Sequence, residues 1–229
     1  MMEAIVLAGG FGTRLRHVVP DLPKPMAPVA GRPFLEILLS TLAKKGFTRI
    51  VLSLGYMAQT IVTHFGDRYQ DMELVYEIED SPLGTGGAIR AALENCRSDH
   101  AYIFNGDTYL DLEVDSLEAM WEQYRQPLIV VREVPDTARY GRVELADGRI
   151  TAFREKGDVG PGLINAGCYV LPRHLLEGFT RGQAFSLESD FFAASIDSVR
   201  FDGFVTRGLF IDIGVPDDYT SAQAMLAGL

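Results

Sequence analysis

The sequence predicts an α/β fold with a doubly wound, mostly parallel β-sheet. Strand-like and helix-like segments alternate through the first half of the chain, which is the pattern of the β-α-β units that build parallel sheets. The chain has 229 residues, of which 47% are hydrophobic, so it can bury a sizeable core. The second half has more strand-like segments and is less regular. We therefore expect a parallel sheet joined to a β-rich half.

In the first half, short apolar runs bounded by glycine or polar residues indicate strands, and apolar residues at helical spacing indicate helices. Such sheets bind ligands at the carboxyl ends of their strands, so we expect the site in the loops after Leu7, Ile78 and Asn105. The expected strands are 4–7, 49–54, 72–78 and 101–105, and the expected helices are 34–45, 58–65 and 88–96.

In the second half, Asp147-Gly148 predicts a hairpin turn between two strands. Ser186 is expected to cap a helix that extends to Ser195, with Glu188 favouring the positive end of the helix dipole. No linker, internal repeat or low-complexity tract divides the chain, so residues 1–229 are expected to form a single domain. The expected strands are 128–134, 141–145, 150–154, 163–171, 199–205 and 209–213, and the expected helices are 113–126, 186–195 and one after Pro216.

Charge and hydropathy exclude several classes of protein. The chain has 21 Lys plus Arg against 31 Asp plus Glu, a net charge of −10, which does not suit binding to the phosphate backbone of DNA or RNA. No run approaches the ~20 apolar residues that cross a bilayer, and Glu3 stands where a signal peptide would carry positive charge. We expect a cytoplasmic protein without nucleic-acid or membrane partners. Cys96 and Cys168 have no metal-ligand spacing and are expected to be buried thiols.

A glycine-rich turn at residues 7–15 follows the first expected strand. Its glycines let the backbone approach a ligand and direct N–H groups at phosphate oxygens, and Arg14 adds a bidentate donor. The turn is neither a Walker A loop nor a dinucleotide fingerprint, because no Gly-Lys-Ser/Thr follows and Leu15 stands where the fingerprint needs glycine. Five of the eleven prolines lie at 20–33, so this stiff segment should be an ordered loop, neither helix nor central strand. It holds Lys24 between two prolines, and Arg14 and Lys24 together predict a phosphate site.

Short motifs occur in order along nearly the whole chain. They are GGFGTRL at 9–15, PKPM at 23–26, PLGTGG at 82–87, NGD at 105–107, FREK at 153–156, NAG at 165–167 and DIGVPDDY at 212–219. This set resembles the signature of the sugar-1-phosphate nucleotidylyltransferases. In KPMAP at 24–28, PFLE at 33–36 and GVP at 214–216 it most resembles the D-glycero-α-D-manno-heptose 1-phosphate guanylyltransferases.

The resemblance implies a Rossmann-like nucleotidyltransferase (GT-A-like) fold, with a nucleotide-binding part at about 1–110 and a β-rich sugar-phosphate-binding part at about 111–229. It implies that a sugar 1-phosphate attacks the α-phosphorus of a nucleoside triphosphate and expels pyrophosphate. Arg14 would hold the triphosphate, and Lys24 would lie near the α-phosphate and the attacking oxygen, because two anions must be brought together. The partners are these two small molecules, and the chain would be a monomer or a homodimer.

The resemblance also implies the nucleotide contacts. Glu79 can accept hydrogen bonds from N1–H and the 2-amino group of guanine, which favours GTP. Gly84 would give the edge of the base room. The implied contacts are Leu7, Ala8, Gly9, Gly10, Gly12, Thr13, Arg14, Glu79, Pro82, Gly84 and Thr85.

Asp107 and Asp212 each follow an apolar strand and are the implied metal ligands, since Mg²⁺ prefers carboxylates, phosphate oxygens and water. The implied catalytic residues are Arg14, Lys24 and Asp107. For the sugar phosphate, Lys156 would contact the phosphate. Glu155 and Asn165 would bind hydroxyl groups, and Gly141 would allow close approach.

Other functions stay open at this point. Mannose-1-phosphate guanylyltransferase, or a uridylyltransferase of N-acetylmuramate 1-phosphate or a hexose 1-phosphate, shares the same chemistry. Uridylyl-transferring relatives can also resemble the loop at 79–84, the base loop, which is expected to recognise the base. A glycosyltransferase commonly holds its metal with Asp-x-Asp, and the sequence has no such motif. A non-catalytic, sugar-nucleotide-sensing relative would tolerate loss of Arg14, Lys24, Asp107 or Asp212, and all four are present.

Overall fold

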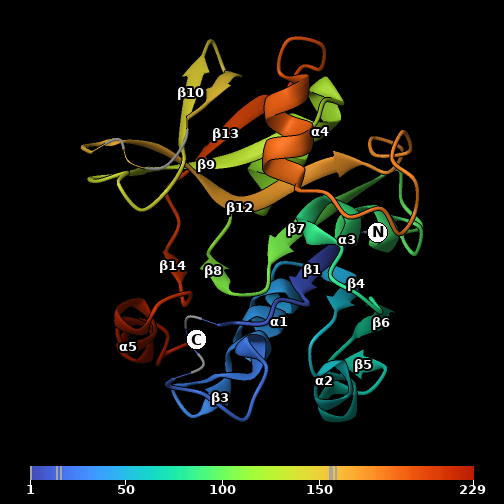
Figure 1. Cartoon of the computed structure of the whole chain (residues 1–229), viewed down its shortest axis with the longest axis vertical. Coiled ribbons are helices and arrows are strands. Elements are labelled where there is room, and N and C mark those ends of the chain that lie inside the picture. The colour runs from blue at the N-terminus through green and yellow to red at the C-terminus, as the bar shows by residue number, and fades with distance from the viewer. Residues whose placement is uncertain (1, 14, 16, 155–156, 158) are drawn as a thin grey trace.

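A computed structural model describes residues 2–13, 15, 17–154, 157 and 159–229 (Figure 1). The strands are β1 (Met2–Ala8), β2 (Pro28–Val29), β3 (Arg32–Pro33), β4 (Phe47–Leu54), β5 (Arg68–Tyr69), β6 (Met72–Ile78), β7 (His100–Asn105), β8 (Thr108–Leu110), β9 (Leu128–Val134), β10 (Arg142–Ala146), β11 (Arg149–Phe153), β12 (Gly162–Pro172), β13 (Asp202–Thr206) and β14 (Phe210–Asp212). The helices are η1 (Lys24–Met26), α1 (Phe34–Lys44), α2 (Ala58–Phe65), α3 (Gly84–Leu93), α4 (Val114–Tyr124), η2 (Leu187–Ala193) and α5 (Pro216–Met225), where η1 is a 3₁₀-helix and η2 a π-helix.

A single sheet runs through both halves of the described chain, in the order β10-β11-β13-β9-β12-β7-β1-β4-β6-β5. In the first half β7, β1, β4 and β6 are parallel neighbours, as the alternating segments predict. Strand β12 is antiparallel to both β7 and β9 and carries the sheet into the second half. Parallel pairing there is confined to β9 and β13, so the β-rich half is mixed. The Asp147-Gly148 turn joins β10 to β11 with positive φ at both residues, which confirms the predicted hairpin.

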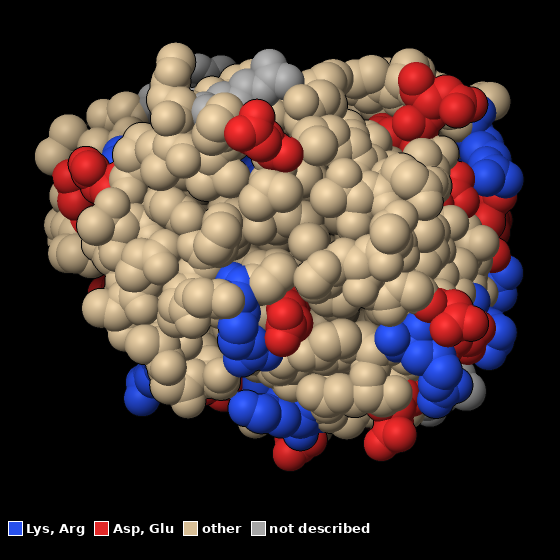
Figure 2. Space-filling model, turned by 90° about the horizontal axis from the view of Figure 1, so that it is seen from below, with Lys and Arg blue, Asp and Glu red and all other residues tan. Residues whose placement is uncertain are grey.

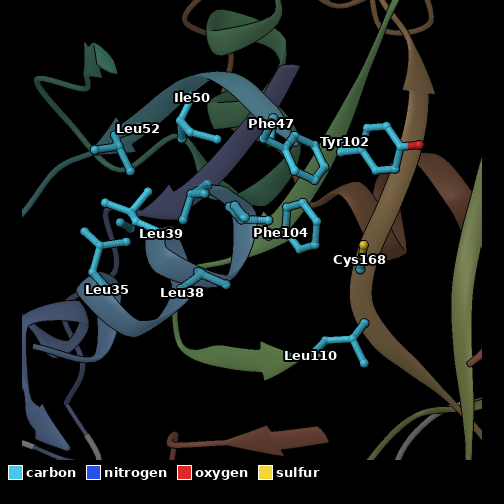
Figure 3. Packing of buried hydrophobic residues seen from close by; sticks show 14 of the residues in the cluster. Leu35, Leu38, Leu39, Phe47, Ile50, Leu52, Tyr102, Phe104, Leu110 and Cys168 are labelled. Atoms are coloured by element: carbon cyan, nitrogen blue, oxygen red, sulfur yellow. The ribbon is translucent and has the colours of Figure 1, made fainter. Parts of the chain in front are cut away.

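Helices cover both faces of the sheet, so the α/β doubly wound class is confirmed. On one face, Leu35, Leu38 and Leu39 of α1 belong to one apolar cluster with Leu52 of β4 and Phe104 of β7 (Figure 3). On the other face, residues of α3, including Ile89, pack with β1 and β4 and with the aromatic residues of η2. Each fully buried side chain of this size contributes about 1.5–3 kcal/mol relative to exposure, so the two apolar layers hold the strand ends, and therefore the site, in fixed positions.

Three expected segments differ from the structure. In the expected helix 186–195, Ser186 accepts from the N–H of Ser189 as the predicted cap, but the helix is the π-helix η2 and spans only Leu187–Ala193. The stiff segment 20–33 is not a plain loop, because it contains the single 3₁₀ turn η1 and the short ribbon β2–β3. Pro25 lies in the first turn of η1, where its missing N–H costs no hydrogen bond. Helix α3 spans Gly84–Leu93 and so starts four residues before the expected 88–96, since its glycines allow the first turn to pack against residues 183–185. Strands β5 and β8 were not predicted, because segments of two or three residues carry no periodicity.

The end of the chain returns to the first half. Strand β14 pairs antiparallel with β8, with Asp212 opposite Thr108, and α5 follows it (Figure 1). A third apolar cluster joins this ribbon to the proline segment, through Val29, Phe34 and Ile213 among others. Because of this pairing, residues at the ends of β7 and β14 become neighbours.

Charges of both signs are interspersed on the face in Figure 2, where Lys and Arg groups lie beside Asp and Glu. No helix in the described part of the chain has the length and apolar character needed to span a bilayer. Cys96 and Cys168 are buried free thiols, as expected. Burial raises the pKa of Cys96 to about 12 and also raises the pKa of Cys168, so neither thiol is activated as a nucleophile.

Candidate active site

A cavity of about 310 Å³ lies at the carboxyl ends of the parallel strands. The expected loops after Leu7, Ile78 and Asn105 all contribute to it. Strand β4 also contributes, through Ser53, although its end was not among the expected positions. The cavity is lined by Leu7, Ala8, Gly9, Gly10, Phe11, Lys24, Pro25, Ser53, Glu79, Pro82, Gly84, Thr85, Ala88, Asn105, Gly106 and Asp107.

The glycine loop that follows β1 forms one wall of the cavity, and glycine has a different structural role at Gly9, Gly10 and Gly12. A Cβ at Gly9 would lie 2.5 Å from Oε1 of Glu79, so glycine lets the carboxylate lie against the loop. At Gly12, which has φ +60°, a Cβ would lie 2.8 Å from Cβ of Lys24. A Cβ at Gly10 would meet nothing within 4 Å among the described residues, so its exposed backbone is open to a ligand.

Lys24 and Asp107 form an ion pair at the other wall. Nζ of Lys24 donates to Oδ2 of Asp107 at 2.6 Å, and the Lys24 side chain is only 10% exposed against 36% for Asp107. The β8–β14 pairing brings Asp212 to the same place, because the N–H of Ile213 donates to the carbonyl oxygen of Asp107 at 2.9 Å. A Cβ placed on Gly214 would lie 2.7 Å from Oδ1 of Asp212 and 3.2 Å from Nζ of Lys24. The structure therefore brings together three residues that lie far apart in the sequence.

The two carboxylates suit a divalent cation that takes its remaining ligands from elsewhere. Among the residues that the structure describes, no group of three or more His, Cys, Asp or Glu side chains could hold a metal. Two carboxylates completed by phosphate oxygens and water is the usual arrangement for Mg²⁺ in phosphoryl-transfer sites. Asp107 and Asp212 therefore fit the predicted magnesium site, and their role stays a prediction.

Glu79 closes the base loop. Its Oε2 accepts a hydrogen bond from the N–H of Leu83 at 2.8 Å, while Oε1 points toward Gly9 and Gly55. Burial raises the pKa of the Glu79 carboxyl, and the hydrogen bond from Leu83 opposes this rise. One oxygen of Glu79 thus shapes the loop, the other lies against Gly9 and Gly55, and Glu79 is part of the cavity lining.

Gly84 and Thr85 are held from outside the cavity. Gly84 has φ +69°, and a Cβ there would lie 2.5 Å from the carbonyl oxygen of Phe185. Glycine at this position is therefore required by packing, in addition to any room it leaves for a base. Oγ1 of Thr85 donates to Oε2 of Glu188 at 2.7 Å and accepts from the N–H of Leu187 at 2.9 Å.

The sequence of this cavity-bearing chain matches a family model, described as nucleotidyl transferase, over residues 3–228. The chain belongs to the nucleotidyl transferase family. This match spans nearly the whole of the described sheet and both walls of the cavity, and it confirms the family that the motifs indicate.

Named relatives of this nucleotidyl transferase cover almost all of it. It is 40% identical over 226 residues to D-glycero-alpha-D-manno-heptose 1-phosphate guanylyltransferase of Aneurinibacillus thermoaerophilus, covering 98% of each chain. The crystal structure of HddC from Yersinia pseudotuberculosis complexed with GMP-PN matches with a TM-score of 0.88 and 37% identity, over 98% of this chain and 99% of that chain. Mannose-1-phosphate guanylyltransferase of Mycobacterium tuberculosis is 34% identical over 98% of this chain but only 64% of that protein.

Several predicted residues of this nucleotidyl transferase lie away from the cavity lining or outside the described residues. Arg14, Glu155 and Lys156 lie outside the described residues. Gly141 lies beside β10, where a Cβ would be 3.1 Å from the carbonyl oxygen of Arg154. Among the described residues, Gly12, Thr13, Gly141, Asn165 and Asp212 do not line the cavity.

Asn165 lies on β12, where the pairing with β9 shifts register. Its Oδ1 accepts from the N–H of Gly167 at 2.9 Å, and its Nδ2 donates to the hydroxyl of Tyr169 at 2.8 Å. The irregular segment at 165–167 lies against the cavity wall, because a Cβ at Gly167 would be 2.4 Å from Nδ2 of Asn105, a residue that lines the cavity. The structure therefore holds Asn165 close to the cavity.

Six lining residues of this nucleotidyl transferase were not among the predicted contacts. Ser53 could have been predicted, because it lies at the carboxyl end of a parallel strand, where ligands bind. Asn105 and Gly106 belong to the NGD motif. Phe11 lies in the GGFGTRL motif, is 51% exposed, and has its ring centroid 5.6 Å from that of Tyr56. The six residues are Phe11, Pro25, Ser53, Ala88, Asn105 and Gly106.

Proposed function

We propose that this chain transfers GMP from GTP to D-glycero-α-D-manno-heptose 1-phosphate, forming a nucleotide sugar and releasing pyrophosphate. The observation that carries the proposal is the cavity itself, with Glu79 on one wall and the Lys24–Asp107 pair on the other. The likeness at 40% identity to a heptose 1-phosphate guanylyltransferase over 98% of both chains supports this substrate pair.

The proposed reaction needs no strong general base from the protein. The attacking oxygen of a sugar 1-phosphate is already an anion, so the main task is to bring two anions together in line and offset their repulsion. Lys24 can do this at the α-phosphate, because its ammonium group is held at the cavity wall by Asp107. The open backbone at Gly10 can donate to phosphate oxygens, and we assign Arg14 and Lys156 to the triphosphate and the sugar phosphate.

Asp107 and Asp212 would hold Mg²⁺. When bound, this ion supplies neutralisation of phosphate charge and fixes the orientation of phosphate oxygens. The protein contributes the pairing of β8 with β14, which brings both carboxylates close to Lys24. Removal of divalent cations with EDTA should therefore stop transfer, and addition of Mg²⁺ should restore it.

Guanine selectivity would come from Glu79. Guanine offers N1–H and an amino group side by side to one carboxylate, and uracil and thymine have no such pair of donors. Glu79 lines the cavity, and its Oε1 lies beside Gly9 of the glycine loop. The expected cytoplasmic location and the expected monomer or homodimer stay predictions.

Product analysis tests the proposal. Incubation with GTP and D-glycero-α-D-manno-heptose 1-phosphate should give GDP-heptose by mass spectrometry, with one pyrophosphate per product. The second candidate is a mannose-1-phosphate guanylyltransferase, which the 34% identity to the Mycobacterium tuberculosis enzyme favours. Faster formation of GDP-mannose than of GDP-heptose at equal substrate concentration would replace the first candidate with the second.

A further inference from the structure

Glu188 of the π-helix η2 is the centre of a hydrogen-bond network that reaches two parts of the molecule. Its Oε2 accepts from Oγ1 of Thr85 at 2.7 Å and from Oγ of Ser186 at 3.1 Å. Its Oε1 accepts from the hydroxyl of Tyr169 at 3.2 Å. One carboxylate therefore joins the start of α3 to the middle of β12, two elements that are far apart in the sequence.

The two ends of this network lie at different substrates of the proposed reaction. Thr85 lines the nucleotide cavity. At the other end Tyr169 accepts from Nδ2 of Asn165 at 2.8 Å, and the resemblance assigns Asn165 to the sugar. Helix η2, orange in Figure 1, packs against α3 and so holds this connection in place.

Building on the function proposed above, we propose that Glu188 is a positioning residue that fixes two parts of the site relative to each other. The first is the start of α3 with Thr85, the nucleotide wall, and the second is the part of β12 with Asn165 and Tyr169, the sugar wall. Glu188 acts on GTP through Thr85 and on the sugar 1-phosphate through Tyr169 and Asn165. In-line attack needs both substrates placed within a fraction of an ångström, and Glu188 is the group through which the described network passes from one wall to the other.

The network requires a carboxylate at its centre. Glu188 accepts from donors at both of its oxygens, which an ionised carboxylate can do and an amide cannot. Tyr169 is fully buried and already accepts from Asn165, so its own proton needs an acceptor. In a Glu188→Gln variant the amide group would face either the Tyr169 or the Thr85 side as a second donor. The hydroxyl proton of buried Tyr169 or of half-buried Thr85 would then be left without an acceptor, which costs more than the loss of an exposed hydrogen bond.

Steady-state kinetics with both substrates tests this role. Glu188→Leu, which removes both acceptor oxygens at similar volume, should raise the KM for GTP and the KM for the sugar 1-phosphate, each by about tenfold, as expected for a lost hydrogen bond to a charged group. Glu188→Gln keeps one acceptor oxygen and should raise one of the two KM values. Tyr169→Phe should raise the KM for the sugar 1-phosphate alone, and Thr85→Val the KM for GTP alone. The double variant of Glu188→Gln with Tyr169→Phe should have the same sugar KM as Tyr169→Phe, because the unpaired proton is gone.

Asp190→Asn is the matched control. Asp190 is an exposed carboxylate of the same helix, and it bonds to the N–H of Ser186 and the hydroxyl of Ser189. This variant should keep both KM values within twofold of wild type. A merely structural role for Glu188 would lower the melting temperature of Glu188→Gln and leave both KM values unchanged, which would overturn the proposal.

Other outcomes are equally decisive. A change in only one KM in Glu188→Leu would show that the residue does not join the two walls. If Glu188→Leu does not fold, Tyr169→Phe and Thr85→Val provide the test, and a Tyr169→Phe variant with an unchanged sugar KM would overturn the proposal. Wild-type activity is measured first. If another nucleotide or sugar proves to be the substrate, the proposed function fails, and the same KM comparison is made with that pair.

Discussion

The substitution Asp107→Asn tests most sharply whether the wall formed by Lys24 and Asp107 acts through the charge of Asp107. It removes a charge from beside Lys24 with almost no change in volume, and the amide oxygen can still accept the hydrogen bond of Nζ, which is 2.6 Å long in the structure. If Asp107 acts through its charge, turnover should be lost while the fold is kept.

The size of both effects follows from the geometry. Lys24 is nine-tenths buried and Asp107 about one-third exposed, so the pair lies between a surface and a buried ion pair. Loss of the charge should cost about 1–2 kcal/mol of unfolding free energy, between the values for those two classes. In a chain of 229 residues this lowers the melting temperature by about 2–8 °C. Loss of a group that stabilises charge in the transition state should lower kcat by about 10²–10³-fold or more.

Asp111→Asn is a matched control. Oδ1 of Asp111 lies 2.7 Å from Nζ of Lys45, and neither residue lines the cavity. Pyrophosphate release at saturating Mg²⁺ and at limiting Mg²⁺ measures activity, and thermal denaturation measures stability. The control should lose no more than about 1 kcal/mol and keep its kcat. Near-normal kcat for Asp107→Asn at limiting Mg²⁺ would refute the two-carboxylate site.

Three further predictions concern the base loop, its packing and the thiols. Glu79→Gln should raise the KM for GTP about tenfold. Because burial raises the pKa of Glu79 above 4.5, the wild-type KM for GTP should rise as the pH falls through that raised pKa and the carboxyl becomes protonated; a Gln variant with the same pH profile would contradict this. Gly84→Ala should destabilise the fold by more than the roughly 1–2 kcal/mol of left-handed strain, because its Cβ meets Phe185; Gly148→Ala, with φ +76° and no neighbour within 4 Å among the described residues, should show the strain alone in urea denaturation. Cys96 and Cys168 should react with a thiol reagent at pH 8 only in denaturant, and rapid labelling of the native protein would contradict their burial.

The long periodic elements could be predicted from the sequence, and the short ones could not. Strands 72–78 and 128–134 have the bounds that their apolar runs predict. Helix α3 starts earlier than predicted because the fit of its glycines against residues 183–185 is a tertiary effect that no local pattern shows. The ribbon of β8 and β14 was missed in part for the same reason, since β8 has only three residues and is defined by its distant partner.

The site was predicted through motifs more than through local physics. Lys24 and Asp107 were each assigned to phosphate chemistry, and the structure places them in contact. The position of Asp212 beside them depends on strand pairing across more than one hundred residues. The Glu188 network was not foreseen, because Glu188 was interpreted only as a helix-start carboxylate, and two of its partners come from the distant elements α3 and β12.

The measurement that tests the central claim most directly is a matrix of nucleoside triphosphates against sugar 1-phosphates, read by pyrophosphate release. GTP, UTP, dTTP and CTP would each be paired with D-glycero-α-D-manno-heptose, mannose, glucose and N-acetylmuramate 1-phosphates. We predict the highest kcat/KM for GTP with the heptose 1-phosphate. A higher kcat/KM for UTP or dTTP than for GTP with every sugar would contradict both the role of Glu79 and the proposed function.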